Sequence, residues 1–266
     1  SLREINDETL AATPAARRIE VLGELVETAY DYDDQEERLR LARMNYAENV
    51  ALPSPLWQQA EAALELVRAL QAGDNKQQSK EASALLKQTE QSLRAHLAKH
   101  DDGKAAMELG SVLSAGEPAN QPAAVIAIRQ EIVDLYIKHP AQTGSGLARQ
   151  RTSLAEALED AGRKGEAEEQ LLLAGSELKR GSSPTSYETE TWALDYGWFL
   201  IDSDRAERAS QFITPFVEGS KKDEAGLYTF GRDVRLLAAM AAREQGNWKE
   251  VRAITMPIHI LKTRQR

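Results

Sequence analysis

The stretch EALEDAGRKGEAEEQLLLAGSEL, residues 156–178, decides what kind of fold this chain can adopt. Two segments rich in Ala, Leu and Glu, which are good helix formers, meet at a corner marked by Gly162 and Gly165. Small residues at Ala155, Ala167 and Ala174 fall where two helices would have to approach closely. The stretch therefore predicts a helical hairpin, which is either one hairpin of an ordinary bundle or one unit of a repeated array.

Composition extends the helical prediction to the whole chain. Aromatic residues make up only 6% of the 266 residues, and Val and Ile show no strand-like alternation. Gly and Pro divide the sequence into about a dozen helical segments joined by short turns, which implies antiparallel neighbours and an all-α fold. The expected segments are 14–31, 35–50, 55–72, 75–100, 102–115, 121–138, 145–161, 164–180, 184–202, 205–218, 227–245 and 247–258.

A repeat of 42 residues favours the array over the bundle. The corner GRKGEAEEQL (162–171) aligns with DRAERASQFI (204–213) and with GNWKEVRAIT (246–255) at this step. The same step relates small residues in the preceding helix and prolines in the following one. Three sites that keep one period are the signature of stacked units. The small residues are Ala155, Gly197 and Ala239, and the prolines are Pro215 and Pro257.

The repeated positions resemble the tetratricopeptide-repeat family, in which a small residue lets the two helices of a unit approach. The 42-residue step resembles the longer-helix variety of kinesin light chain and of many bacterial repeat proteins. This resemblance implies a right-handed α-solenoid of antiparallel helix pairs, with TPR-like repeats over 102–258, degenerate helical hairpins over 1–101 and a basic tail at 259–266. The residues that carry it are Ala106, Leu109, Gly110 and Leu113, then Arg151, Leu154, Ala155 and Leu158, then Ala167, Leu171 and Ala174, then Tyr196, Gly197, Leu200, Ala209 and Ile213.

Charge and cysteine usage exclude several classes of function. A net charge of −9 argues against nucleic-acid binding and against adsorption to an anionic membrane, and no apolar run is long enough for membrane insertion. The absence of cysteine excludes thiol chemistry but does not fix the compartment. The compartment is not fixed, and a cytoplasmic location is favoured. A periplasmic location is the alternative if an upstream signal was removed, since the chain begins at Ser1 without a methionine.

The sequence predicts neither a catalytic residue nor a cofactor or metal site. His96 and His100 in HLAKH have the i, i+4 spacing of two zinc ligands, but a third ligand is not evident and a solvated helix end is the preferred interpretation. The carboxylate runs at 31–37, 156–160 and 165–169 are interpreted as solvated surface rather than as acid–base pairs. A nucleophile turn of the G-x-S-x-G kind is missing from the sequence.

The segment TWALDYGWFLI (191–201) concentrates aromatic residues in a chain that has few. The resemblance places the first helix of each unit on the concave face, with Tyr196 and Gly197 on the packing side. The opposite side, extended to the next unit by the 42-residue step, predicts an apolar peptide-binding groove. A terminal or missing segment that covers this patch is the alternative. The predicted groove residues are Thr191, Leu194, Trp198, Ile201, Leu236 and Met240.

These observations predict a non-catalytic scaffold that binds a peptide or helix of another protein in a concave groove. The alternative is the sensory or regulatory region of a larger signalling protein, such as a kinase or a transcriptional regulator. An enzyme is disfavoured because no catalytic constellation converges.

Overall fold

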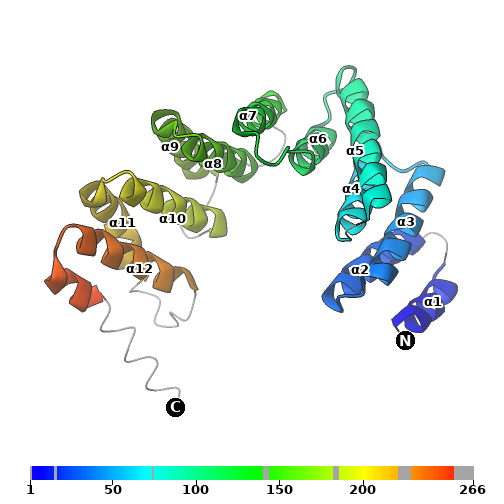
Figure 1. Ribbon diagram of the computed structural model, residues 1–266, viewed down its shortest axis with the longest axis horizontal. Coiled ribbons are helices and arrows are strands. Elements are labelled where there is room, and N and C mark those ends of the chain that lie inside the picture. Colours follow the sequence, from blue (N-terminus) through cyan, green and yellow to red (C-terminus); the bar gives the residue numbers. More distant parts are fainter. Residues whose placement is uncertain are drawn as a thin grey trace, which may run out of the picture. The chain divides into compact units, whose positions relative to one another are not determined.

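The computed structural model describes residues 2–14, 17–73, 75–139, 144–181, 186–220 and 229–254, and the regular elements in these ranges are α-helices. The predicted all-α fold is thereby confirmed. The chain divides into two compact units, residues 1–142 and 143–266, which are described separately (Figure 1). The predicted boundary at 101/102 concerns where the sequence repeats become recognisable and stays a prediction. The predicted tail at 259–266 lies outside the described residues.

The first unit has a single helix followed by helix pairs. The single helix is α1 (Leu2–Ala12), and the pairs are α2 (Arg18–Asp31) with α3 (Gln35–Ala51), α4 (Leu56–Gln71) with α5 (Lys76–Leu97), and α6 (Gly103–Ala115) with α7 (Pro122–Lys138). Side-chain caps start three of these helices, because Asp34, Asn75 and Asp102 each accept hydrogen bonds from backbone N–H groups two or three residues further on. Consecutive helices pack against each other, and α4 also packs against α6.

Two apolar clusters form the core of the first unit. One joins α2, α3 and α4 through side chains such as Leu22, Leu41 and Leu70, each with none of its surface exposed. The other joins α4, α5, α6 and α7 and includes Leu93 and Leu109. Burying a leucine completely stabilises a fold by about 1.5–3 kcal/mol, so these clusters hold the helix pairs together.

Helix α1 lies outside the predicted helices and is attached to the rest of the first unit by polar contacts and by two leucines. Its buried residues are Asn6 and Leu10 only. Asn6 Nδ2 donates to Glu37 Oε1 at 2.9 Å, and Arg40 bridges Asp7 and Glu37 at 3.0 and 2.6 Å. Leu2 and Leu10 also pack against an apolar cluster of the first unit, so polar and apolar contacts together attach α1.

The second unit contains α8 (Gly144–Asp160), α9 (Lys164–Gly181), α10 (Tyr187–Asp202), α11 (Ala206–Ser220) and α12 (Thr229–Glu244), followed by helical residues at 248–254. The corners that end α8, α10 and α12 have one geometry. Gly162, Asp204 and Gly246 each have positive φ, at 74°, 58° and 71°. The next residue donates its N–H five residues back in each case, at 2.8 to 2.9 Å. This is the Schellman ending of a helix, repeated at 42-residue steps.

The small residues of the repeat are also equivalent in the second unit. Ala155 is 1% exposed and Ala239 is 6% exposed, and Gly197 is buried. A Cβ added to Gly197 would lie 2.3 Å from Leu237 Cδ2, so a side chain at this position would prevent α10 and α12 from packing as closely. Together with the corners, these contacts confirm the predicted array of antiparallel helix pairs. Pro257 of the predicted repeat lies outside the described residues.

None of the helices in the described ranges is long and apolar enough to cross a membrane.

Candidate functional site

Helix α10 carries most of the predicted groove, and its position is fixed by a cap and by its packing side. The Ser186 hydroxyl accepts a hydrogen bond from the Thr189 N–H at 3.3 Å, and acidic residues occupy the first turn, where they suit the helix dipole. Trp192 is 7% exposed and donates from Nε1 to the Leu171 carbonyl oxygen at 2.7 Å. Tyr196 is 4% exposed, so the predicted packing side of α10 is confirmed.

Most predicted groove residues of α10 lie on the face that meets α12, which Gly197 also contacts. Leu194, Trp198 and Ile201 are half-buried and pack against a cluster formed by α11 and α12. On α12, Met240 is half-buried and Leu236 is 51% exposed. Five of the six predicted residues thus lie on the neighbouring helices α10 and α12. Their side chains are partly buried and partly exposed to solvent. The cluster that Leu194, Trp198 and Ile201 pack against consists of Ile213, Val234, Leu237 and Ala238.

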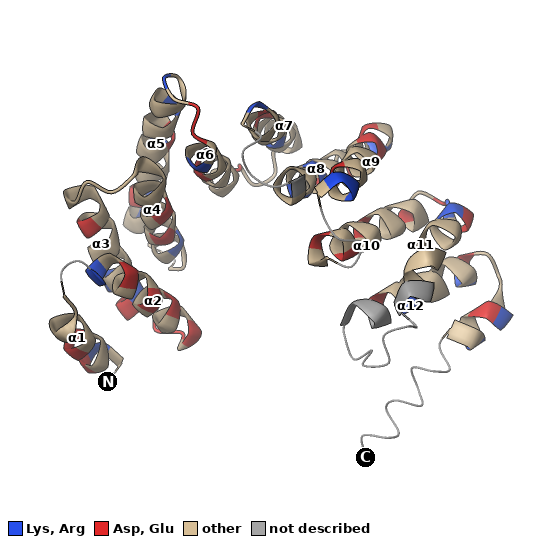
Figure 2. Ribbon diagram, turned by 180° about the vertical axis from the view of Figure 1, so that it is seen from behind, with Lys and Arg blue, Asp and Glu red and all other residues tan. Residues whose placement is uncertain are grey.

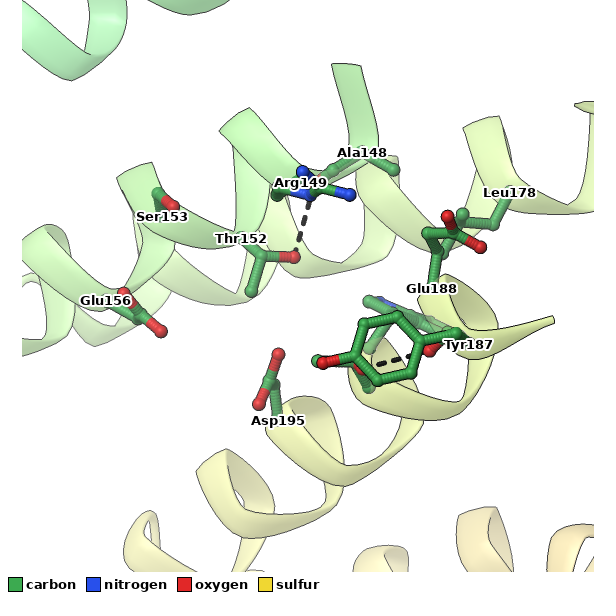
Figure 3. Close-up of a pocket in the computed structure, with 11 residues that line it drawn as sticks. Ala148, Arg149, Thr152, Ser153, Glu156, Leu178, Tyr187, Glu188 and Asp195 are labelled. Carbon is green, nitrogen blue, oxygen red and sulfur yellow. Dashed lines mark hydrogen bonds between the residues drawn. The ribbon is translucent and has the colours of Figure 1, made fainter. Parts of the chain in front are cut away.

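Thr191, the sixth predicted residue, lines a separate hollow between α8 and α10. Its hydroxyl donates to the Tyr187 carbonyl oxygen at 2.9 Å, and the side chain is exposed. The hollow encloses about 160 Å³, and α8 contributes Thr152 and Glu156 to its other wall. Figure 3 shows Glu156 and Asp195 on opposite sides of this hollow. Helix α10 therefore lines one site with α8 and contacts α12 along its other edge.

Carboxylates give the α8 edge of this site its electrostatic character. Burial, together with the nearby charge of Glu156, raises the pKa of Asp195 to about 6. Burial and the charge of Asp202 also raise the pKa of Glu159 above its usual value. Like charges on α8 and α10 thus oppose each other, and a ligand that brings positive charge would relieve them.

Sequence reasoning missed part of this hollow. Tyr187, Thr191 and Asp195 follow each other at intervals of four, so they share one side of α10. That spacing could have identified Tyr187 and Asp195 once Thr191 was chosen. The contribution of Arg149 on α8 could not be found in this way, because it depends on how the two helices are placed.

The two histidines of HLAKH lie at the end of α5. The ring centroids of His96 and His100 are 4.6 Å apart, and His96 Nε2 is 3.0 Å from Asp102 Oδ2. Asp102 is the N-cap residue of α6, so His96 connects the two helices. Within the described ranges, no group of three or more His, Cys, Asp and Glu side chains is arranged to hold a metal ion.

Two glutamates from the predicted solvated runs have structural roles instead, so that interpretation is wrong for them. Glu37 is 4% exposed and accepts from Asn6 and Arg40. Glu168 accepts from Arg205 at 2.8 Å and from the Tyr196 hydroxyl at 3.2 Å, which joins α9 to α10 and to the corner after it. Burial alone would raise the pKa of Glu168, but these hydrogen bonds lower it and keep the carboxylate charged.

Comparison with known proteins identifies the fold. The sequence matches no family model and no curated protein. Among solved structures, BtubC (BKLC) from P. vanneervenii is similar with a TM-score of 0.64 at 13% identity, over 95% of this chain and 92% of that one. The STAND protein with a tetratricopeptide repeat sensor from Pyrococcus horikoshii has a TM-score of 0.63 at 13% identity, over 98% of this chain and 38% of that one.

A third similar structure is a single-residue variant of the "Podosopora anserina putative kinesin light chain nearly identical TPR-like repeats", with a TM-score of 0.50 at 12% identity over 96% of this chain and 100% of that one. At these identities the likeness concerns the fold. The chain therefore has a TPR-like fold of the kind found in kinesin light chain repeats, as the sequence predicts.

Proposed function

We propose that this chain is a non-catalytic interaction module that binds a peptide or a helix of another protein along α8, α10 and α12. The observation that carries the proposal is the set of large apolar side chains left partly open on α10 and α12. Leu194, Trp198 and Ile201 are half-buried, and Leu236 is 51% exposed. Apolar anchors that are partly open in the free protein are what a protein partner can bury. The TPR-like fold supports this function by analogy.

A second candidate is that the chain is the sensory or regulatory part of a larger signalling protein. The Pyrococcus horikoshii protein is a signal transduction ATPase with a tetratricopeptide repeat sensor, and this chain covers 38% of it. In that setting the same residues would bind the activating partner. The full-length gene discriminates between the two candidates, because a neighbouring catalytic or DNA-binding domain would favour the second.

Site-specific photocrosslinking in the native source tests where the partner lies. A photoreactive amino acid replaces Leu236 on α12, and a matched sample carries it at Leu172 on α9, which is 47% exposed. Both leucines are about half open, so they differ in position rather than in accessibility. We expect a protein adduct from position 236 that is absent from position 172. Equal adducts from both positions, or an adduct from position 172 alone, would contradict the proposal.

Truncation of Trp198 tests the energetics once the crosslinked partner is identified. Loss of an aromatic anchor commonly weakens binding by about 2–4 kcal/mol, so Trp198→Ala should raise the Kd by a factor of tens or more. Thr191→Ala should change it little, because Thr191 lies in the separate hollow between α8 and α10 and not beside Trp198. Trp192→Ala is the control for folding, because this side chain is 7% exposed and its loss should lower the unfolding temperature first. The groove assignment is wrong if Trp198→Ala mainly lowers the unfolding temperature and Trp192→Ala mainly raises the Kd.

A further inference from the structure

A second hollow lies in the first unit, between α2 and α4, with α3 at its base. It encloses about 330 Å³. Five of the residues that line it are glutamates, and none is Lys or Arg. Figure 2 shows the acidic residues on α2 and α4 in red. This hollow belongs to the other compact unit and shares no residue with the groove of α10 and α12.

Three of the five glutamates have no ion-pair partner in the part of the chain that the structure describes. Glu20 is paired with Arg17 at 3.3 Å, and Glu65 is paired with Arg38 and Arg68. The remaining three, Glu24, Glu27 and Glu61, form no ion pair within the described ranges. Their charges face the hollow from both walls, two from α2 and one from α4.

The base of the hollow adds a buried acceptor that also lacks a partner. Asn49 on α3 is 1% exposed, and its Nδ2 donates to the backbone oxygen and to Oδ1 of Asn45, both at 3.0 Å. The Asn45 carbonyl can only accept, which fixes the orientation of the Asn49 amide. Asn49 Oδ1 receives no hydrogen bond from the described residues. Buried polar atoms are nearly always hydrogen-bonded, so this oxygen calls for a donor from outside the chain.

These features define the chemistry of a ligand. Carboxylates and an orphan amide oxygen only accept hydrogen bonds, so the ligand must supply donors and positive charge. The described residues contain no group of three or more acidic or histidine side chains arranged for a metal ion, which leaves an organic cation. A guanidinium group has five N–H donors in a planar fork and no acceptor, and it pairs with carboxylates in two-pronged fashion.

The negative field extends past the hollow to α6. Glu61 also faces Glu108, and burial together with the charge of Glu61 raises the pKa of Glu108 to about 7, while Arg68 opposes this rise. After burial, the charge at position 61 is the second cause of the raised pKa of Glu108. A cation bound beside Glu61 would relieve both carboxyl groups.

We propose that this hollow, lined by Glu24, Glu27, Glu61 and Asn49, is a binding site for an arginine side chain carried by a basic segment of a partner protein. The inference goes beyond the proposed function, because it concerns the first unit and does not require the groove of the second unit to bind anything.

A fluorescently labelled peptide of alternating Arg and Ala residues is the probe, and anisotropy titration gives its affinity for the whole chain. The same peptide with citrulline in place of Arg keeps the shape and removes the charge. The test variant is the double substitution Glu24→Gln and Glu61→Gln. The matched control is Glu8→Gln and Glu36→Gln, which changes the net charge equally at exposed positions of α1 and α3 outside the hollow.

We expect the Arg peptide to bind the parent chain and the citrulline peptide not to bind it. The double substitution in the hollow should raise the Kd of the Arg peptide by about tenfold or more, whereas the control substitutions should change this Kd by less than about twofold. The Asn49 side-chain amide should shift saturably in NMR spectra of the titration. Trp198→Ala should leave this binding unchanged, which separates the result from that of the proposed function. Circular dichroism checks that the glutamine variants, which break no ion pair in the described chain, remain folded.

Three outcomes would overturn the inference. The Arg peptide could fail to bind the parent chain even at low salt. Both double variants could weaken binding alike, which would indicate attraction by net charge only. Trp198→Ala could abolish binding while the hollow variant does not, which would place the peptide in the second unit.

Discussion

Gly175 on α9 and Trp192 on α10 show how closely two helices approach when one of them lacks a side chain. A Cβ added to Gly175 would lie 2.1 Å from Trp192 Cζ2, far inside normal contact distance. Trp192 cannot easily move away, because its Nε1 is hydrogen-bonded to the Leu171 carbonyl and its ring lies edge-on to Phe212. The smallest possible side chain at position 175 would therefore force the two helices apart.

We expect Gly175→Ala to lower the free energy of unfolding by about 1–3 kcal/mol, the usual cost of overpacking. Urea unfolding followed by circular dichroism measures it. Gly165→Ala is the matched control on the same helix, where an added Cβ meets no atom within 4 Å. The control should be neutral or gain about 0.5–1 kcal/mol, because alanine is the better helix former. A parent-like Gly175→Ala would contradict this account of the contact.

At the scale of single residues, spacing predicts the small positions but not the charged ones. The 42-residue step predicts buried small residues at Ala167 and Ala209, and both are 0% exposed. The acidic runs around Glu37 and Glu168 instead suggest a solvated surface, because the partners Asn6 and Arg205 are 31 and 37 residues away along the chain. Local pattern cannot reveal which carboxylate meets a distant donor.

At the scale of helices, the burial of Glu108 on α6 gives a test by pH. Burial and the charge of Glu61 raise the pKa of this carboxyl from 4.5 to about 7 in the folded chain. A raised carboxyl pKa contributes stability that is fully present below the unfolded value and is lost as the pH rises through about 7. The free energy of unfolding should therefore fall between about pH 5 and about pH 8 by up to ~3 kcal/mol through this group.

Glu108→Gln should remove this part of the pH dependence, because glutamine does not titrate. Urea unfolding of the parent chain and of the variant at both pH values gives the difference. Asp134→Asn on α7 serves as an exposed carboxylate control and should leave the pH dependence as in the parent. An identical pH dependence in the parent and in Glu108→Gln would show that Glu108 is charged throughout this range.

Helix bounds are largely predictable, since breakers and caps are local signals. The segment predicted at 145–161 is observed at Gly144–Asp160, and that at 35–50 is observed at Gln35–Ala51. Helix α1 is not among the predicted segments, and its polar contacts are with residues of α3 that lie far away along the chain, which local signals cannot reveal. The hollow of the first unit could not be predicted for a related reason, because its acidic walls belong to α2 and α4, which only the fold brings together.

At the scale of the whole molecule, stacked repeats communicate through neighbours. Helix α10 packs against α8, α9, α11 and α12, whereas α3 packs against α2 and α4 and forms polar contacts with α1. In such arrays stability is close to a sum of local terms and nearest-neighbour interfaces, so the effect of a defect should be confined to the repeats around it. The described contacts of the two compact units therefore predict that each unit can lose stability by itself.

Two leucines allow this to be tested with equivalent defects. Leu200 on α10 is 1% exposed and Leu41 on α3 is 0% exposed, and replacing a fully buried leucine with alanine costs about 2–5 kcal/mol. In amide hydrogen exchange read by mass spectrometry, Leu200→Ala should speed exchange in α8 to α12 and leave α2 to α5 as in the parent. Leu41→Ala should do the reverse, which makes each variant the control for the other. If either substitution speeds exchange uniformly along the chain, the repeats unfold as one cooperative body and the nearest-neighbour description is wrong.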